Sequence, residues 1–133
     1  MAFVLDASIV HAWVFDERQP EAEAVRRRLS TEAAIAPSLW WFEVRNGLIM
    51  GERRGRITER GSARALRDLS RLNITLHHSP DEPAILALAR RHRLTVYDAA
   101  YLELAMREGL ALATLDGELL RAARAEHVSL VGE

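Results

Sequence analysis

Short apolar runs alternate with longer amphipathic stretches along the chain of 133 residues. The short runs are rich in Val, Ile, Leu and Ala, and their length is typical of inner strands of a parallel sheet. The longer stretches repeat apolar positions at helical spacing and are bordered by capping residues. This alternation predicts an α/β fold. Strands are predicted at 2–5, 33–36, 74–78, 111–114 and 128–131. Helices are predicted directly after the first strand and at 19–29, 37–55, 58–72, 79–92, 97–109 and 116–127.

The composition is that of a globular protein, with 49% hydrophobic residues, 28% charged residues and a formal net charge of -1. We therefore expect residues 1–133 to form one domain. Cysteine is absent, which excludes disulfides and thiolate metal sites and is compatible with a cytoplasmic protein. All 18 basic residues are arginines, which excludes mechanisms that need a lysine. The apolar opening segment is interrupted by charges and too short to cross a bilayer, so no membrane association is expected.

Two acids follow closely on predicted strands. Asp6 comes after the strand at 2–5, and Asp116 comes after the strand at 111–114. The carboxyl ends of parallel strands meet at one edge of a sheet, where ligands of α/β proteins bind, so these acids are expected to lie together. Each acid also has an ordinary explanation, because Asp is a favoured N-cap residue whose charge suits the start of a helix.

Glu43 lies inside the apolar helix predicted at 37–55, where no cap explains it. Its neighbours three and four positions away include Leu39 and Trp40, so its face of the helix is not a stripe of solvated charge. A partly buried carboxylate needs a metal, a proton or an arginine from another helix. Asn46 is one turn further on, where it can hydrogen-bond Glu43 and hold its rotamer.

Asp98 begins a helix of core-like residues in "TVYDAAYLELA", residues 95–105. An acid in a first helical turn is ordinary, but Asp98 joins Asp6, Glu43 and Asp116 as a fourth acid at a strand end or an apolar helix position. Four carboxylates in one cleft repel one another, and divalent cations relieve that repulsion. Only oxygen ligands are offered, without cysteine or a histidine pair at zinc-like spacing, so we expect Mg²⁺ or Mn²⁺. Such a site favours metal-assisted hydrolysis of phosphodiesters.

Two hydroxyl residues stand near the acids in the sequence. Ser8 comes two positions after one acid, and Thr114 comes two positions before another. A hydroxyl at these positions can orient a metal-bound water. It can equally make an ordinary hydrogen bond at a turn or a helix start.

Binding of a nucleic acid would need local basic patches, because the net charge is close to zero. Arginine-rich segments occur at 51–56 and 90–93. Arginine matches phosphate geometry, although such segments are also typical of solvated helix ends. Trp40 and Trp41 point about 100° apart on a helix, so one is expected in the core and the other at a surface.

Four segments resemble the motifs of PIN-domain ribonucleases, most closely those of the VapC toxins of bacterial toxin-antitoxin pairs. They are "VLDAS" at 4–8, "PSLWWFEVRNGL" at 37–48, "TVYDAAYLELA" at 95–105 and "LATLDGELLRAA" at 112–123. The likeness spans nearly the whole chain and shows no departure at the acids. By this resemblance, the catalytic and metal-binding acids are Asp6, Glu43, Asp98 and Asp116, and the supporting polar residues are Ser8, Asn46 and Thr114.

The resemblance implies an α/β/α sandwich with a parallel central sheet, and Mg²⁺- or Mn²⁺-dependent cleavage of an RNA substrate. It also implies a homodimer, and a toxin that inhibits translation and growth until a cognate VapB-like antitoxin neutralises it. Two alternatives stay open. One is a PIN-fold RNA-processing nuclease without an antitoxin, and the other is a non-catalytic domain whose acidic cleft binds metal or a partner's arginine.

Overall fold

The computed structural model describes residues 2–132, which form a four-stranded parallel sheet with helices on both faces. The strand order is β3-β2-β1-β4, so the first strand of the chain lies inside the sheet. The strands are β1 (Ala2–Leu5), β2 (Ala33–Pro37), β3 (Ile74–His77) and β4 (Ala111–Ala113). The helices are α1 (Ala7–Val14), α2 (Pro20–Arg28), α3 (Leu39–Arg53), α4 (Glu59–Ser70), α5 (Glu82–His92), α6 (Val96–Glu108) and α7 (Gly117–Ala125). The predicted α/β/α class is therefore confirmed.

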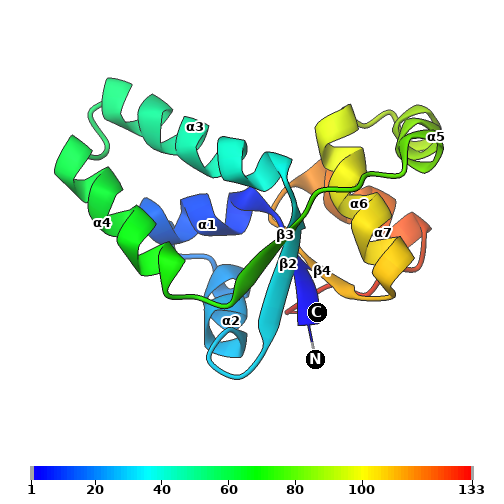
Figure 1. Ribbon diagram of the computed structural model, residues 1–133, viewed down its shortest axis with the longest axis horizontal. Coiled ribbons are helices and arrows are strands. Elements are labelled where there is room, and N and C mark those ends of the chain that lie inside the picture. Colours follow the sequence, from blue (N-terminus) through cyan, green and yellow to red (C-terminus); the bar gives the residue numbers. More distant parts are fainter. Residues whose placement is uncertain (1, 133) are drawn as a thin grey trace.

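The sheet stands between two groups of helices, with α1, α3 and α4 on one side and α5, α6 and α7 on the other (Figure 1). The central strand β1 is buried from Phe3 to Leu5. Helix α6 is buried at every position from Ala99 to Ala105, because it packs against the sheet as well as against α5 and α7. Burial on all sides explains why the sequence of α6 reads as apolar with little amphipathic character.

The longest of the helices α1 to α7 is α3 with 15 residues, fewer than the roughly 20 that span a bilayer. Within residues 2–132, none of them combines the length and the apolar character that crossing a membrane requires.

The prediction of a fifth strand at 128–131 is wrong. Leu130 makes a single parallel bridge to Leu112, supported by backbone bonds from Leu112 N to Ser129 O (2.8 Å) and from Val131 N to Leu112 O (3.0 Å). The backbone turns at both ends of this segment, with φ of 59° at His127 and 91° at Gly132. The extended part is therefore too short for a ladder against β4, which itself has 3 residues.

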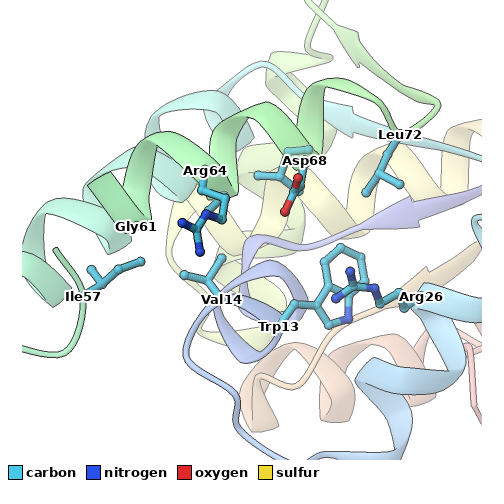
Figure 2. A pocket seen from close by; sticks show the side chains of 10 residues that line it. Trp13, Val14, Arg26, Ile57, Gly61, Arg64, Asp68 and Leu72 are labelled. Carbon is cyan, nitrogen blue, oxygen red and sulfur yellow. The ribbon is translucent and has the colours of Figure 1, made fainter. Parts of the chain in front are cut away.

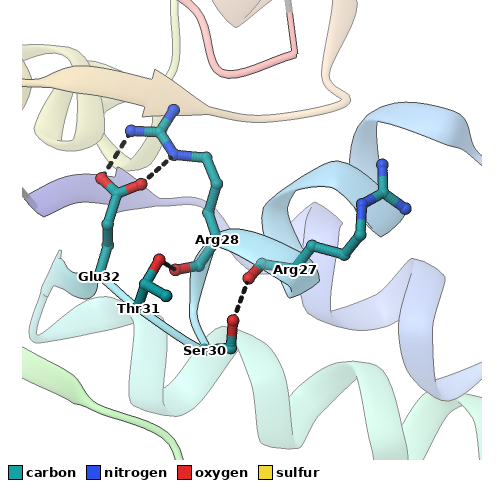
Figure 3. Close-up of polar contacts among 5 residues, drawn as sticks. All are labelled: Arg27, Arg28, Ser30, Thr31 and Glu32. Atoms are coloured by element: carbon teal, nitrogen blue, oxygen red, sulfur yellow. Dashed lines mark hydrogen bonds and ion pairs between the residues drawn. The ribbon is translucent and has the colours of Figure 1, made fainter.

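Side-chain hydrogen bonds close the carboxyl end of α2 and lead the chain into β2 (Figure 3). Ser30 Oγ donates to the carbonyl of Arg27 at 2.7 Å, and Thr31 Oγ1 donates to the carbonyl of Arg28 at 3.4 Å. Arg28 also forms two bonds to the carboxylate of Glu32, at 2.7 and 2.8 Å. The two hydroxyl bonds satisfy carbonyl groups that the last turn of a helix leaves unpaired.

The sheet brings the carboxyl ends of its strands to one edge. Asp6 follows β1, and its backbone N–H donates to the carbonyl of Ala113 in β4 at 2.9 Å. Chain segments that are more than one hundred positions apart are thereby joined where α1 and α7 begin. Helix α3 starts at the same edge, immediately after β2. This edge is where the candidate site lies.

Candidate active site

All four acids singled out in the sequence line one cleft of about 270 Å³. Asp6 and Asp116 occupy the N-cap positions of α1 and α7, Asp98 lies in the first turn of α6, and Glu43 lies in the second turn of α3. The complete lining is Asp6, Ala7, Ser8, His11, Glu43, Asn46, Gly47, Asp98 and Asp116. Three helix starts and one helix interior thus contribute a carboxylate each, and no arginine belongs to the lining.

Asp6 is held by two hydroxyl groups. Its side chain is 5% exposed, and Oδ2 accepts hydrogen bonds from Ser8 Oγ (2.7 Å) and Thr114 Oγ1 (2.6 Å). Both hydroxyls in turn accept backbone N–H groups, from Leu115 to Ser8 at 2.9 Å and from Asp116 to Thr114 at 3.0 Å. Ser8 and Thr114 therefore position Asp6, through a network that also orders the turn before α7.

The two acids that follow strands, Asp6 and Asp116, differ in whether they cap the helix that they begin. Asp116 Oδ2 accepts the backbone N–H of Leu119 at 2.9 Å and is a genuine cap as well as part of the cleft. Asp6 makes no side-chain cap bond to α1. Burial raises the pKa of Asp6, and the nearby charge of Asp116 adds to that increase, while the bonds from Ser8 and Thr114 oppose it. A buried carboxyl group without a cap bond is the more unusual of the two.

Glu43 is bound by Tyr101, one of the core-like residues in the segment 95–105. Tyr101 OH donates to Glu43 Oε1 at 2.6 Å, and the Tyr101 side chain is fully buried. Burial raises the pKa of Glu43, as do the charges of Asp6 and Asp98, and the bond from Tyr101 lowers it. Within residues 2–132, no arginine pairs with Glu43, so the alternative of an interhelical ion pair is wrong.

Asn46 lies in the cleft, but no hydrogen bond joins it to Glu43 among the bonds of the described chain. The contact that fixes the backbone near Glu43 comes from His11, whose Nε2 lies 3.1 Å from the Glu43 carbonyl. Gly47 leaves room for this imidazole, because a Cβ at position 47 would overlap the His11 ring. The sequence offered two signals for these neighbours. A buried phenol one turn after Asp98 needs a partner, and a glycine inside a helix marks a close contact.

Asp98 combines both explanations given for it. Its backbone N–H donates to Thr95 Oγ1 at 3.1 Å, so it does lie in a capped first turn. Its side chain lines the cleft, where burial and the charges of Asp116 and Asp6 raise the pKa of Asp98 to about 6. The carboxyl groups of Asp6, Glu43 and Asp98 are therefore all harder to ionise than usual, mainly because they are buried and also because they lie near other acids.

The donor set suits a hard divalent cation, because it consists of carboxylate and hydroxyl oxygens with excess negative charge. As the side chains stand, no three His, Asp or Glu groups within residues 2–132 are close enough together to hold one ion. Oδ2 of Asp6 and Oε1 of Glu43 are occupied by hydroxyl donors. The carboxylates that line the cleft must therefore rotate toward one another to bind an ion. The oxygen donors are of the kind that Mg²⁺ or Mn²⁺ prefers, but in this structure they lie too far apart to hold one.

A second cavity of about 310 Å³ lies between α1, α2 and α4, away from the acids (Figure 2). Its wall is mostly apolar, and Asp68 is the one acid among its lining residues. The Trp13 indole N–H donates to the carbonyl of Ala22 at 2.8 Å, so that donor is already used. The lining is Trp13, Val14, Arg26, Ile57, Gly61, Arg64, Ala65, Asp68, Leu69 and Leu72. This cavity offers no cluster of reactive groups.

Neither predicted arginine patch lines the acidic cleft. In the segment 51–56, Arg56 binds Glu17 at 3.3 Å and covers the ring of Phe15. In the segment 90–93, Arg91 binds Glu126 at 2.8 Å. The two tryptophans divide as expected, with Trp40 buried and Trp41 44% exposed.

The sequence of the chain matches a known protein family and its members. The PIN domain matches residues 3–125. Ribonuclease VapC3 from Pyrobaculum aerophilum is 37% identical over 123 residues, which cover 90% of this chain and 92% of that protein. The chain therefore belongs to the PIN-domain family, in its VapC branch.

Two solved structures share the fold. PAE2754 from Pyrobaculum aerophilum superposes with a TM-score of 0.70 at 29% identity, covering 92% of this chain and 87% of that chain. A toxin-antitoxin complex from Klebsiella pneumoniae superposes with a TM-score of 0.57 at 18% identity, covering 86% of each chain. The second likeness concerns the fold alone.

Proposed function

We propose that this protein is an endoribonuclease that hydrolyses RNA phosphodiester bonds with Mg²⁺ or Mn²⁺ held by Asp6, Glu43, Asp98 and Asp116. The observation that carries the proposal is the gathering of four carboxylates in one cleft without a cation among its lining residues. The name of the Pyrobaculum relative, a ribonuclease, supports RNA as the substrate. A divalent ion in such a site neutralises phosphate charge and lowers the pKa of a water molecule.

The residues of the chain contribute orientation and charge. Ser8 and Thr114 hold Oδ2 of Asp6, so its other carboxylate oxygen remains for a ligand. Tyr101 holds Oε1 of Glu43 in the same way. Because hydrogen bonds fix both carboxylates, little side-chain entropy is lost when they bind an ion. Thr95 lies beside Asp98 and lowers the pKa of the Asp98 carboxyl, which lines the cleft with the other three acids.

We further propose that the protein is the toxin of a type II toxin-antitoxin pair, that it inhibits translation and growth, that it forms a homodimer in the cytoplasm, and that a VapB-like antitoxin neutralises it. The relatives of VapC type and the fold shared with a toxin-antitoxin complex support this assignment. A test is expression with and without the neighbouring reading frame. Growth arrest that the neighbour relieves is the expected result, and growth that is unaffected in both cases would contradict the toxin assignment.

Cleavage by the purified protein tests the catalytic proposal. RNA should be cut in Mg²⁺ or Mn²⁺ and remain intact with EDTA, and Asp98→Asn should abolish cleavage, because a neutral amide is a poor ligand for a divalent ion. Asp68→Asn is the matched control, since Asp68 is an exposed acid on α4 and should leave cleavage unchanged.

Cleavage by the Asp98→Asn variant at the parent rate would refute the role of Asp98. If the parent protein binds Mn²⁺ but cuts no RNA, the non-catalytic alternative is correct.

A further inference from the structure

Two aromatic rings stand exposed beside the acids. Phe42 is 68% exposed and Tyr97 is 63% exposed, the two largest values among the exposed large hydrophobic side chains of residues 2–132. Burying such rings is favourable, so free rings at a cleft mark a surface that binds something. Phe42 directly precedes Glu43, and Tyr97 directly precedes Asp98. Each ring is therefore tied by the backbone to a carboxylate of the candidate site.

The rings line a cavity that shares two lining residues with the acidic cleft. This cavity of about 440 Å³ is bounded by Leu39, Phe42, Glu43, Asn46 and Tyr97. Glu43 and Asn46 also line the cleft that holds the four acids. A ligand held between the aromatic residues would thus be in contact with the place where the carboxylates gather.

Phe42 is supported in its position. Its ring meets the ring of Trp41 edge to face, with centroids 5.0 Å apart and an angle of 70° between the planes. The guanidinium of Arg45 covers Trp41 at 3.9 Å and donates to the Trp41 carbonyl at 3.0 Å. The three side chains form a stack along α3, so Phe42 offers a ring whose orientation is already set.

We propose that Phe42 and Tyr97 form a nucleobase subsite, in which a base of single-stranded RNA next to the bond to be cut stacks on these rings. The proposal rests on the nuclease function proposed above. Aromatic side chains stack on every base, and unpaired RNA exposes its bases for such contacts. The cleft lining contains no arginine that would bind phosphate, so contacts to a base would add affinity beside the cut. The Asn46 amide, with donors and an acceptor, is available to the edge of the base.

A second copy of the chain is the competing occupant of this surface. The polar residues of the cavity favour RNA, because Glu43 and Asn46 would lose water under an apolar protein face without gaining partners. Trp41 and Ile49 are also exposed apolar residues of α3, but neither lines the cavity. Substituting them would weaken a general apolar contact surface but not a base subsite, so variants at these positions distinguish the two possibilities.

The experiment measures cleavage of an unstructured RNA labelled with a fluorophore and a quencher. Phe42→Ala and Tyr97→Ala should each lower kcat/KM by about 5- to 150-fold, mainly through KM, as expected for the loss of one stacking contact. Ile49→Ala is the control on the same helix as Phe42 and should keep the parent value, because Ile49 does not line the cavity.

A modified substrate tests stacking directly. Replacing the base beside the cut by an abasic sugar should cost the parent protein as much as Phe42→Ala does, and combining the two changes should cost little more. Unchanged kcat/KM in both alanine variants would overturn the subsite. So would a loss of activity that parallels a fall in mass in sedimentation, because the rings would then belong to a contact between copies.

The two proposals fail in different ways. If the parent protein cuts no RNA under any metal condition, the nuclease function fails and the subsite fails with it. If the parent protein cuts RNA and the alanine variants cut it equally well, the subsite alone is refuted.

Discussion

The carboxyl group of Asp6 takes its partners from hydroxyl groups rather than from a cation. Ser8 and Thr114 share one oxygen of Asp6, and Tyr101 donates to one oxygen of Glu43 in a similar manner. Neutral donors fix the position of a carboxylate without cancelling its charge, so the electrostatic demand of the cleft remains. The same residues that order the acids therefore leave their negative charge in place, as the proposed binding of a divalent ion requires.

At the residue scale, Tyr101→Phe should remove the hydrogen bond that positions Glu43 while keeping the packing of the buried ring. The ring stays, but Glu43 loses its donor, so the free energy of unfolding should fall by about 1 to 2 kcal/mol, as for a buried hydrogen bond. The affinity for Mn²⁺ should fall about 10-fold or more, because Glu43 is no longer held. Urea denaturation and calorimetric titration measure the two effects. Tyr97→Phe is the control, since its exposed hydroxyl has no part in holding Glu43. Unchanged Mn²⁺ affinity in Tyr101→Phe would show that Glu43 needs no support.

The candidate acids and the hydroxyl residues Ser8 and Thr114 could be found from the sequence, whereas the particular partner of Glu43 could not. Asp6, Glu43, Asp98 and Asp116 each break a local pattern, and a broken pattern is visible in one dimension. The bond from Tyr101 to Glu43 joins residues 58 positions apart and depends on how α3 and α6 pack. Only the tertiary structure determines that distance.

Among the elements, α3 depends on a close contact with α1. His11 of α1 reaches the Glu43 carbonyl, and Gly47 on α3 provides the space for its ring. Helix propensity alone would favour alanine at position 47. The glycine therefore reflects the contact between the helices, not a weakness of α3.

Gly47→Ala should destabilise the protein in spite of its better helix propensity. The new Cβ would overlap the His11 ring, at a cost of about 1 to 3 kcal/mol, which outweighs the gain of about 1 kcal/mol expected for alanine in a helix. Thermal and urea denaturation measure the net effect. Gly117→Ala is the control, because no atom lies within 4 Å of its added Cβ.

The double variant His11→Ala with Gly47→Ala completes this test. It should recover much of the stability lost by Gly47→Ala, because the clash needs both side chains. A Gly47→Ala protein that is more stable than the parent would show that the two helices do not constrain each other here.

Strand boundaries show where sequence patterns reach their limit at this scale. The apolar runs at β1, β2, β3 and β4 were found because buried parallel strands read as continuous apolar segments. The run at 128–131 has the same appearance but makes a single bridge. The segment does not form a strand because the backbone is left-handed at His127 and Gly132, which the apolar pattern does not predict.

At the scale of the whole molecule, the acidic cleft should make stability depend on pH and metal together. The pKa of Asp98 is raised from 3.8 to about 6, and the pKa values of Asp6 and Glu43 are raised in the same direction. Between pH 3.8 and about 6, these three carboxyl groups bind more protons in the folded protein than in the unfolded chain. The free energy of unfolding should therefore decrease as the pH rises through this range, by about 1 to 2 kcal/mol from Asp98 after solvent screening.

Urea denaturation in EDTA and in Mn²⁺, from pH 4 to 8, measures this dependence. Mn²⁺ should restore stability above the raised pKa values, by about 2.7 kcal/mol when the ion is present at 100 times its Kd. Asp98→Asn should flatten the profile in EDTA and weaken the rescue by Mn²⁺. A profile in EDTA that rises through this range, or one that Mn²⁺ leaves unchanged, would contradict the proposed charge cluster.

The strand order has a consequence for protein synthesis. Strand β1 pairs with β4 as well as with β2, and Asp6 is fixed by Ala113 and Thr114. Asp6 therefore acquires these neighbours only after more than one hundred further residues have been synthesised. A nascent or truncated chain that stops before Asp116 lacks one of the four carboxylates, so the cleft is assembled late in the synthesis of this domain.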